Sequence, residues 1–365
     1  MNFKSLFDLN FLLIFLIILL TIVGIAALYT AADGNIYPWA IRHSIRFSIL
    51  FVVMIIVALI DVKFIFKYSY VVFSVCLILL FSVEIIGTFG KGAERWIKIF
   101  GLSIQPSELI KIGIILSLAK YYHNVKFENI GQLNVLLIPF MIIAVPFFLV
   151  LIQPDLGTSL CIALLGIFIM FISGVRIWKF AIGIIISLFS IPFLWNYIQP
   201  YQQKRILSFL NPESDPMGQG YQLIQSKIAL GSGGLTGKGF LQGTQSYLEY
   251  LPEKQTDFIF TLIGEEFGFL GTIFVLFLFS LIILICFYTS IKSNHIFGRI
   301  ISLGIGSNLF LYVLLNMSMV TGLMPVVGIP LPLLSYGGTA MLSVMMSFGL
   351  LLNMDIYYNI KKIDI

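Results

Sequence analysis

Long apolar runs recur along the whole chain, each bounded by charged or turn-forming residues. A helix that crosses about 30 Å of hydrocarbon needs about 20 apolar residues, which is the length of most of these runs. The pattern predicts about ten spans, with a range of roughly nine to eleven because two are weakly bounded. They lie near residues 11–29, 45–60, 71–87, 107–121, 135–152, 158–173, 180–198, 258–288, 300–321 and 334–354.

The longest polar segment, residues 199–256, separates the seventh span from the eighth. Most loops in compact folds are only a few residues long, so this length is unusual. Within it, residues 220–230 have the spacing of an amphipathic helix that lies on the membrane interface. Residues 231–239 are rich in glycine and permit tight turns, but their spacing is not that of a phosphate-binding P-loop.

The composition agrees with this pattern, because 59% of the residues are hydrophobic and only 11% are charged. A soluble, disordered or nucleic-acid-binding chain is therefore excluded. The three cysteines all lie in apolar runs, which leaves no disulfide or zinc framework. We predict an all-α polytopic membrane protein, a single membrane domain over residues 1–365. The first span is too long for a signal peptide and has no small-residue cleavage site before Asp33, so it is interpreted as a retained anchor.

The placement of the positive charges predicts the orientation. An even number of spans puts both termini on one side of the membrane. The 22 Lys and Arg residues then divide almost evenly, about eleven to each side. Five of the outer ones lie in the long polar segment, where the positive-inside rule loses force, and every short inner connection carries a cation. We expect both termini to be cytoplasmic, and the outer cations to be retained for another purpose such as binding an anion.

Charges beside or within membrane spans are costly, so they are the first candidates for a functional site. One cluster begins with Lys91, Arg95 and Trp96 in the connection before the fourth span. For Arg95 and Trp96 the alternative is an interfacial anchor, since Trp favours the headgroup level.

The fourth span itself begins with a short polar motif that includes Gln105 and Ser107. Glu108 and Lys111 follow at i and i+3, so they share a helix face and can pair in the bilayer. The alternative to a functional role is an ion pair that only locks two helices together.

A second cluster, residues 153–158, joins two spans by a tight turn that contains Asp155. A carboxylate at this position can also be explained as the N-cap of the following helix.

A third cluster ends at Asp257, at the junction of the long polar segment with the eighth span. Its carboxylate would lie at the N-terminus of a helix, where water meets lipid. The helix dipole favours the ionised form while partial burial beside two phenylalanines opposes it, a combination that suits a general base. Capping of the eighth helix by Thr256 and Asp257 is the competing interpretation.

Two further features accompany this cluster. Glu265 and Glu266 cannot both face lipid, so at least one is expected to face a polar cavity or to pair with a cation. The run 322–338, which includes Ser335, is apolar yet non-helical in character, and is predicted to form a re-entrant segment or a cavity wall. The three histidines are scattered and show no metal spacing.

Taken together, these motifs resemble the SEDS proteins (shape, elongation, division and sporulation), a family of polytopic peptidoglycan glycosyltransferases. The resemblance covers nearly the whole chain. The short segment before Phe11 and the brief tail after Tyr358 are more similar to the elongation branch of the family than to the division branch. The motifs that carry it are residues 91–96 leading into 105–108, then 153–158, 233–239, 251–260 and 325–338.

The resemblance implies polymerisation of lipid II on the outer face of the bacterial cytoplasmic membrane, with undecaprenyl pyrophosphate as the leaving group. In the family the carboxylate that matches Asp257 is essential. The residues matching Arg95, Trp96, Glu108 and Lys111 are functionally sensitive. A class B penicillin-binding transpeptidase and other elongation-complex proteins are the implied partners.

The residues themselves fit this chemistry. Asp257 would deprotonate the acceptor hydroxyl, and a single base suggests one inverting displacement. Arg95, with Lys91 and Lys238, would bind the pyrophosphate. A divalent cation, magnesium or manganese, is another source of that charge, although no dedicated metal site is visible. A lipid flippase or transporter, and a non-catalytic scaffold for a transpeptidase, are the alternative functions.

Overall fold

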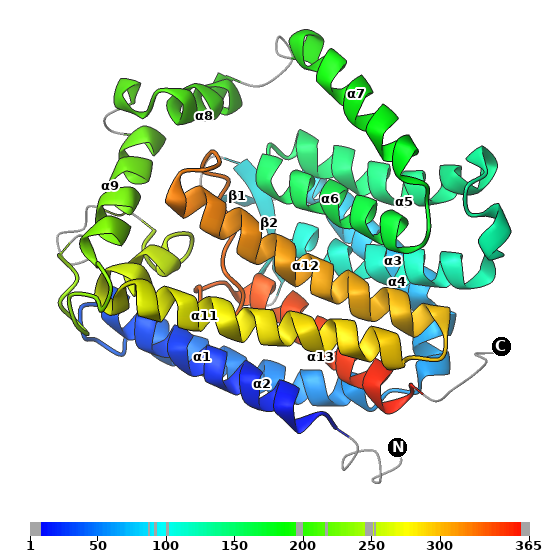
Figure 1. Ribbon diagram of the computed structural model, residues 1–365, viewed down its shortest axis with the longest axis horizontal. Helices are drawn as coiled ribbons and strands as arrows, with labels where there is room; N and C mark the ends of the chain where they lie inside the picture. The colour runs from blue at the N-terminus through cyan, green and yellow to red at the C-terminus, as the bar shows by residue number, and fades with distance from the viewer. Residues whose placement is uncertain are drawn as a thin grey trace.

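The computed structural model describes residues 9–86, 88–90, 93–99, 102–194, 200–215, 218–244, 251 and 253–358. It is a bundle of long helices with one small sheet (Figure 1). The elements in chain order are α1 Phe11–Ala31, α2 Trp39–Ala58, α3 Val62–Ile86, β1 Thr88–Gly90, β2 Ala93–Ile99, β3 Leu102–Ile104, α4 Pro106–Asn124, η2 Phe127–Asn129, α5 Leu133–Ile152, α6 Leu156–Ile172, α7 Ile177–Leu194, α8 Pro200–Leu210, η4 Pro212–Ser214, α9 Gln219–Ser232, α11 Ile259–Lys292, α12 Ile296–Thr321 and α13 Gly338–Ile356.

The predicted fold class, a helical polytopic membrane protein, is confirmed. Within the described residues, seven helices are long and apolar enough to cross a membrane: α1, α2, α3, α5, α11, α12 and α13. The helices α6 and α7 are apolar but shorter. The remaining predicted span corresponds to α4, which has 19 residues and carries Glu108, Lys111 and Lys120.

Several boundaries differ from the prediction. The helix α2 begins at Trp39 rather than near residue 45, and α3 begins at Val62 rather than near residue 71. Both early turns contain Lys or Arg, whose long stems lie along apolar surface while the charge reaches water, so a boundary set by charge starts too late. The polar segment 199–256 contains α8 and η4 as well as α9, which matches the amphipathic helix expected over residues 220–230.

A three-stranded antiparallel sheet in residues 88–104 was not predicted. Its order is β1-β2-β3, with Thr88 opposite Trp96 and Ile97 opposite Ile104. Only the last three residues of β2, Ile97-Lys98-Ile99, alternate between apolar and charged, and there Ile97 is buried while Lys98 is exposed. This short period-two pattern lies between two long apolar runs, which dominate the hydropathy of the region.

The core of the bundle is α12, which contacts α4, α6, α9, α11 and α13. It runs through the middle of the molecule in Figure 1, in orange. The helix α13, which packs most extensively against α2, is also largely buried. At one end of the bundle Lys292 pairs with Asp355 at 2.9 Å, and Asn10 donates to the same carboxylate at 3.3 Å. The two ends of the described chain therefore meet.

The long helix α11 is broken at Gly268, whose φ of 66° and ψ of −159° are not helical. The glycine-rich loop after α9 enters this break. The N–H groups of Lys238 and Gly239 donate to the carbonyls of Glu265 and Glu266, both at 3.0 Å. These are carbonyls that an unbroken helix would have satisfied itself.

The same loop also completes the second half of α11. The N–H groups of Phe269 and Leu270 donate to the carbonyls of Gly234 and Leu235, at 2.9 and 3.1 Å. Backbone groups at membrane depth must be satisfied by protein. The loop therefore supplies the backbone hydrogen bonds that are missing at the break in α11. This explains why this polar, glycine-rich segment packs against a membrane helix.

Candidate active site

Asp257 lies in the turn immediately before α11, and it is partly buried. The N-cap residue of the helix is Phe258, which provides no side-chain hydrogen bond. The hydroxyl of Thr256 donates to the carboxylate of Glu253 at 3.1 Å. The structure therefore places Asp257 just outside the helix, at its N-terminal end, where the helix dipole favours a negative charge.

The backbone of this turn is held by the run 322–338, which is non-helical as predicted. The N–H of Tyr336 donates to the carbonyl of Gln255 at 2.8 Å. The hydroxyl of Ser335 donates to the carbonyl of Thr256 at 2.6 Å and accepts from the N–H of Leu331 at 2.8 Å. Ser335, a predicted cavity residue, thus fixes the turn that carries Asp257.

The carbonyl of Asp257 follows those of Gln255 and Thr256 and is also held by a hydrogen bond. Its donor is a residue that the sequence analysis did not single out. The side-chain amide of Asn316, in α12, donates to this carbonyl at 2.9 Å and to the carbonyl of Ile329 at 2.7 Å. A methyl group built on Gly328 would lie 3.5 Å from Oδ2 of Asp257. The carboxylate therefore lies next to the side of Gly328 where a side chain would be.

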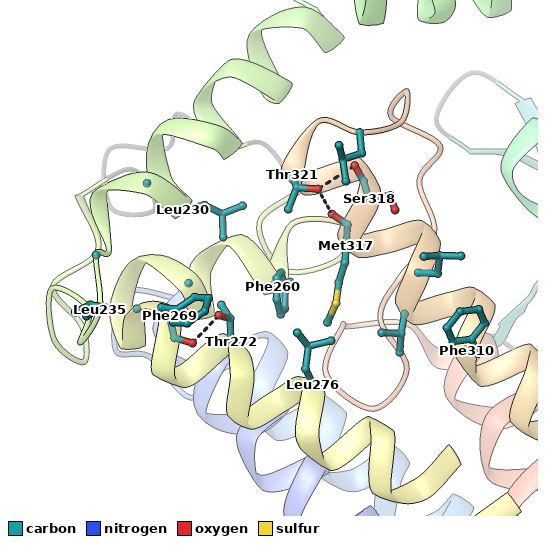
Figure 2. Close-up of a pocket in the computed structure, with 17 residues that line it drawn as sticks. Leu230, Leu235, Phe260, Phe269, Thr272, Leu276, Phe310, Met317, Ser318 and Thr321 are labelled. Carbon is teal, nitrogen blue, oxygen red and sulfur yellow. Dashed lines mark hydrogen bonds between the residues drawn. The ribbon is translucent and has the colours of Figure 1, made fainter. Parts of the chain in front are cut away.

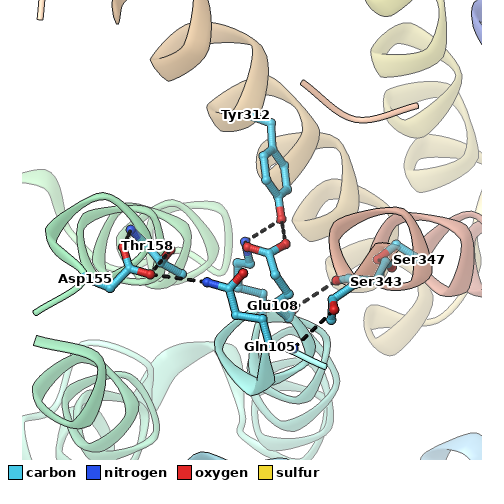
Figure 3. Close-up of polar contacts among 9 residues, drawn as sticks. Gln105, Glu108, Asp155, Thr158, Tyr312, Ser343 and Ser347 are labelled. Carbon is cyan, nitrogen blue, oxygen red and sulfur yellow. Dashed lines mark hydrogen bonds and ion pairs between the residues drawn. The ribbon is translucent and has the colours of Figure 1, made fainter. Parts of the chain in front are cut away.

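Glu108 and Lys111 form the expected ion pair, with 2.7 Å between Nζ and Oε1. They are only 4% and 1% exposed. The hydroxyl of Tyr312 accepts from Lys111 and donates to the other oxygen of Glu108, which closes a triad between α4 and α12 (Figure 3). The hydroxyl of Ser343 holds the backbone carbonyl of Glu108 at 2.9 Å.

Arg95 and Asp155 come together, although 60 residues separate them in the chain. Nε of Arg95 donates to the carbonyl of Gln153 at 3.2 Å, and its terminal nitrogens contact the carbonyl of Pro154 and, at 3.8 Å, the carboxylate of Asp155. The guanidinium is thus engaged with the turn before α6.

The same turn meets the start of α4. The carboxylate of Asp155 accepts from the N–H of Thr158 at 3.3 Å, which makes Asp155 the N-cap of α6, and from the amide of Gln105 at 3.3 Å (Figure 3). Ser107 is buried in the first turn of α4. A cavity of about 20 Å³, enough for one water molecule, is lined by Gln105, Glu108, Lys111, Thr158, Cys161, Gly328, Ile329 and Pro330.

Lys238 lies in the loop that enters α11, and its Nζ is 2.7 Å from the buried carboxylate of Glu265. The hydroxyl of Thr244 contacts both groups, at 2.7 and 3.1 Å. Glu266 is also fully buried, beside the backbone of residue 243. Glu265 thus pairs with a cation, which is one of the two outcomes expected for at least one of these glutamates.

The remaining predicted residues are Trp96 and Lys91. Trp96 is partly buried in β2. Lys91 lies outside the described residues. Among the residues that the structure does describe, no group of three or more His, Cys, Asp or Glu side chains is arranged to hold a metal ion.

An apolar groove with a volume of about 910 Å³ begins one turn beyond Asp257. It lies between α9, α11 and α12, and we name it the Phe260 groove (Figure 2). Several of its side chains, such as Leu235 and Phe269, are more than half exposed at the surface of the bundle. Its lining residues are Leu230, Gly231, Gly234, Leu235, Phe260, Gly264, Gly268, Phe269, Thr272, Leu276, Phe310, Val313, Leu314, Met317, Ser318, Thr321 and Leu323.

Arg46, in α2, is another residue that the sequence analysis did not single out. Its guanidinium stacks on the ring of Tyr336, 4.6 Å from the ring centroid, and lies beside the first residue of α13. Tyr336 is itself bonded to the turn of Asp257 through Gln255. The available signal was an arginine inside a predicted apolar helix, which is expensive unless it serves a purpose.

The architecture and sequence both match known proteins. A family profile named for FtsW, RodA and SpoVE, with the description "Cell cycle protein", matches residues 4–360. The peptidoglycan glycosyltransferase MrdB of Escherichia coli K12 is 42% identical over 291 residues, which is 78% of this chain and 76% of MrdB. Stage V sporulation protein E of Bacillus subtilis is 39% identical over 293 residues, 80% of this chain and 79% of that protein.

Two solved structures share the fold. A chain from a peptidoglycan synthase complex, reported for its coordination of polymerization and crosslinking, superposes with a TM-score of 0.83 at 26% identity. The rod shape determining protein RodA of Thermus thermophilus gives a TM-score of 0.73 at 24% identity. Each match covers 96% of this chain and 98% of the other.

Proposed function

The chain belongs to the FtsW, RodA and SpoVE family of cell cycle proteins, and from this premise we propose that it is a peptidoglycan glycosyltransferase that polymerises lipid II. The proposed role is in cell elongation, in keeping with its similarity to MrdB and to the RodA fold. Division is the alternative role, because an FtsW relative from Trichlorobacter lovleyi is 39% identical.

The observation that carries the proposal is the position of Asp257. A partly buried carboxylate stands at a helix N-terminus, its backbone held at three successive carbonyls, and an apolar groove opens one turn away. A glycosyl transfer between lipid-linked sugars needs this combination of a fixed base and an apolar surface for a polyprenyl chain. The Phe260 groove is proposed to take such a chain.

The proposed step is one displacement. Asp257 accepts the proton of the acceptor's 4-hydroxyl while that oxygen forms a bond to the anomeric carbon of the donor sugar. The bond from the anomeric carbon to the pyrophosphate oxygen breaks, and its electron pair leaves with the lipid pyrophosphate. A single displacement inverts the anomeric configuration.

The departing pyrophosphate needs positive charge. Arg95 is the family candidate, but its guanidinium contacts the turn 153–155, so we propose that it shapes the site. Arg46 stacks on Tyr336 beside the Asp257 turn and is proposed to meet the phosphate directly. A magnesium or manganese ion held by substrate phosphates and one carboxylate would supply similar charge.

The proposed orientation is supported by the positions of charges and helices. Asp257 directly precedes α11 and Lys292 is its last residue, and the part after the break at Gly268 is by itself about 36 Å long at about 1.5 Å per residue, so the two residues lie at opposite ends of this element. We propose that the Asp257 end faces outward from the bacterial cytoplasmic membrane, where the substrate is polymerised, and that both termini are cytoplasmic. A class B penicillin-binding transpeptidase is the proposed partner, supported by the likeness to a chain of a peptidoglycan synthase complex.

The test is polymerisation of labelled lipid II by the purified full-length protein, with the wild type compared with Asp257→Asn. Adding the cognate transpeptidase in a parallel reaction separates an enzyme from a scaffold, because a scaffold makes no glycan strand in either reaction. A flippase would likewise leave lipid II unpolymerised.

A further inference from the structure

Asn316 is a fully buried amide in the middle of an otherwise mainly apolar part of α12. Burying an amide in such surroundings costs free energy unless its polar atoms find partners. Neighbouring Leu315 and Met319 are also buried. An apolar residue of the same size would avoid the cost of burying the amide itself. The presence of Asn316 here therefore needs a specific explanation.

The hydrogen bonds of the Asn316 side chain provide this explanation. Its nitrogen donates to the carbonyl of Asp257 at 2.9 Å and to the carbonyl of Ile329 at 2.7 Å. Both partners are pure acceptors, so the nitrogen rather than the oxygen must face them. The oxygen of Asn316 is buried and accepts no hydrogen bond from the described residues. The two donor contacts are therefore what the side chain provides.

These contacts join two segments at the carboxylate. The carbonyl of Ile329 follows Gly328, on which an added methyl group would lie 3.5 Å from Oδ2 of Asp257. Asn316 holds both carbonyls with one rigid amide. It therefore fixes the backbone of Asp257 relative to the Gly328–Ile329 segment beside the carboxylate. Ser335 and Tyr336 hold the two preceding carbonyls, those of Thr256 and Gln255.

We propose that Asn316 is a positioning residue for Asp257, and that its carboxamide sets the direction in which the carboxylate meets the acceptor hydroxyl. The inference rests on the proposed role of Asp257 as the base. A general base acts only within hydrogen-bond reach of the proton it removes, about 2.6–3.2 Å. A displacement of about 1 Å in such a group can lower the rate on the order of 100-fold.

The test uses two variants of this residue and one matched control. Asn316→Leu keeps the size but removes both donors, and Asn316→Asp keeps the shape but replaces the donating nitrogen with an acceptor. Asn308→Leu, two turns earlier in α12 and also buried, is the control because, within the described residues, Asn316 and not Asn308 bonds the Asp257 turn. Initial rates of lipid II polymerisation are measured against substrate concentration and pH, and thermal unfolding is followed in the same detergent.

We expect both Asn316 variants to lose kcat by about 10- to 100-fold with little change in KM, because the base and not the binding surface is displaced. The pH at which kcat is half-maximal should also move, since the surroundings of the carboxylate change. Asn308→Leu should keep the wild-type kcat and pH profile. Wild-type kcat and pH profile in folded Asn316→Asp, or an equal loss of kcat in Asn308→Leu, would overturn the inference.

Asp257→Asn in the same assay separates this inference from the proposed function. If Asp257→Asn polymerises lipid II like the wild type, the assignment of the base fails, and the inference fails with it. If Asp257→Asn is inactive while Asn316→Asp is folded and fully active, only the inference fails.

Discussion

The guanidinium of Arg46 lies 4.6 Å from the centroid of the Tyr336 ring, and Tyr336 is hydrogen-bonded to the turn that carries Asp257. A cation from α2 is thereby linked through Tyr336 to the turn that carries the proposed base. Stacking on an aromatic ring orients an arginine without using its N–H groups, which stay available for a phosphate.

Arg46→Gln should therefore impair catalysis more than folding. Loss of a charged hydrogen bond to the leaving group predicts a decrease in kcat/KM of about 10- to 100-fold. Steady-state polymerisation of lipid II gives this value. Arg42→Gln, one turn earlier and exposed, is the control and should retain activity; equal losses in both variants would indicate a general charge effect.

Arg95 is expected to behave differently, because its guanidinium contacts two backbone carbonyls and the carboxylate of Asp155. Arg95→Ala should destabilise the protein by about 1.5–3 kcal/mol, the range for hydrogen bonds to a charged group. Thermal unfolding in detergent measures the effect, with the exposed Lys98→Ala in the same strand as control. A variant as stable as the wild type but inactive would instead support direct binding of pyrophosphate by Arg95.

For the buried triad of Glu108, Lys111 and Tyr312, we predict that removing one charge is more harmful than exchanging the two charges. Lys111→Met leaves a carboxylate buried without its cation and should cost about 3–5 kcal/mol in stability. Exchanging the two charges, with Glu108→Lys and Lys111→Glu together, should restore folding and much of the activity, because a hydroxyl can donate to one partner and accept from the other in either order. A folded but inactive exchange variant would show that one of these groups acts on the substrate.

Gly268 can be tested through the loop that fills the break in α11. A methyl group there would lie 2.3 Å from the backbone nitrogen of Gly237 and would occupy a backbone conformation that only glycine adopts readily. Gly268→Ala should cost at least about 1–3 kcal/mol. Gly231→Ala, in α9 with open space around it, should be neutral or stabilising by up to about 1 kcal/mol. Differential scanning calorimetry of both variants measures the two changes in stability.

The sequence predicts the helices well because each long apolar run can cross a membrane only as a helix. It also places Asp257 at a helix N-terminus and pairs Glu108 with Lys111, since both features depend on short spacings. The partners of Arg95 lie about 60 residues away and are mostly backbone carbonyls, which leave no trace in the side-chain pattern. Such contacts require the tertiary structure.

Tyr312 and Asn316 carried a signal that the pattern of charges outweighed. Tyr312 and Asn316 are spaced i and i+4 in an apolar helix, so they share a face, and that spacing alone indicates a polar stripe inside the bundle. The break at Gly268 has no comparable signal, because a glycine within a membrane helix is common. Its conformation depends on the loop that enters from α9.

The most direct test of the account is the rate of glycan-strand formation by purified protein in which Asp257 is replaced by Asn. This change keeps the size and the backbone contacts of the turn but removes the base. The rate is measured with labelled lipid II beside the wild type and Glu213→Gln, an exposed carboxylate in η4, with thermal unfolding as the check on folding. We predict a loss of about 100-fold or more in Asp257→Asn, unchanged lipid II affinity and a wild-type rate in Glu213→Gln. Equal rates of polymerisation by folded wild type and Asp257→Asn would contradict the central claim.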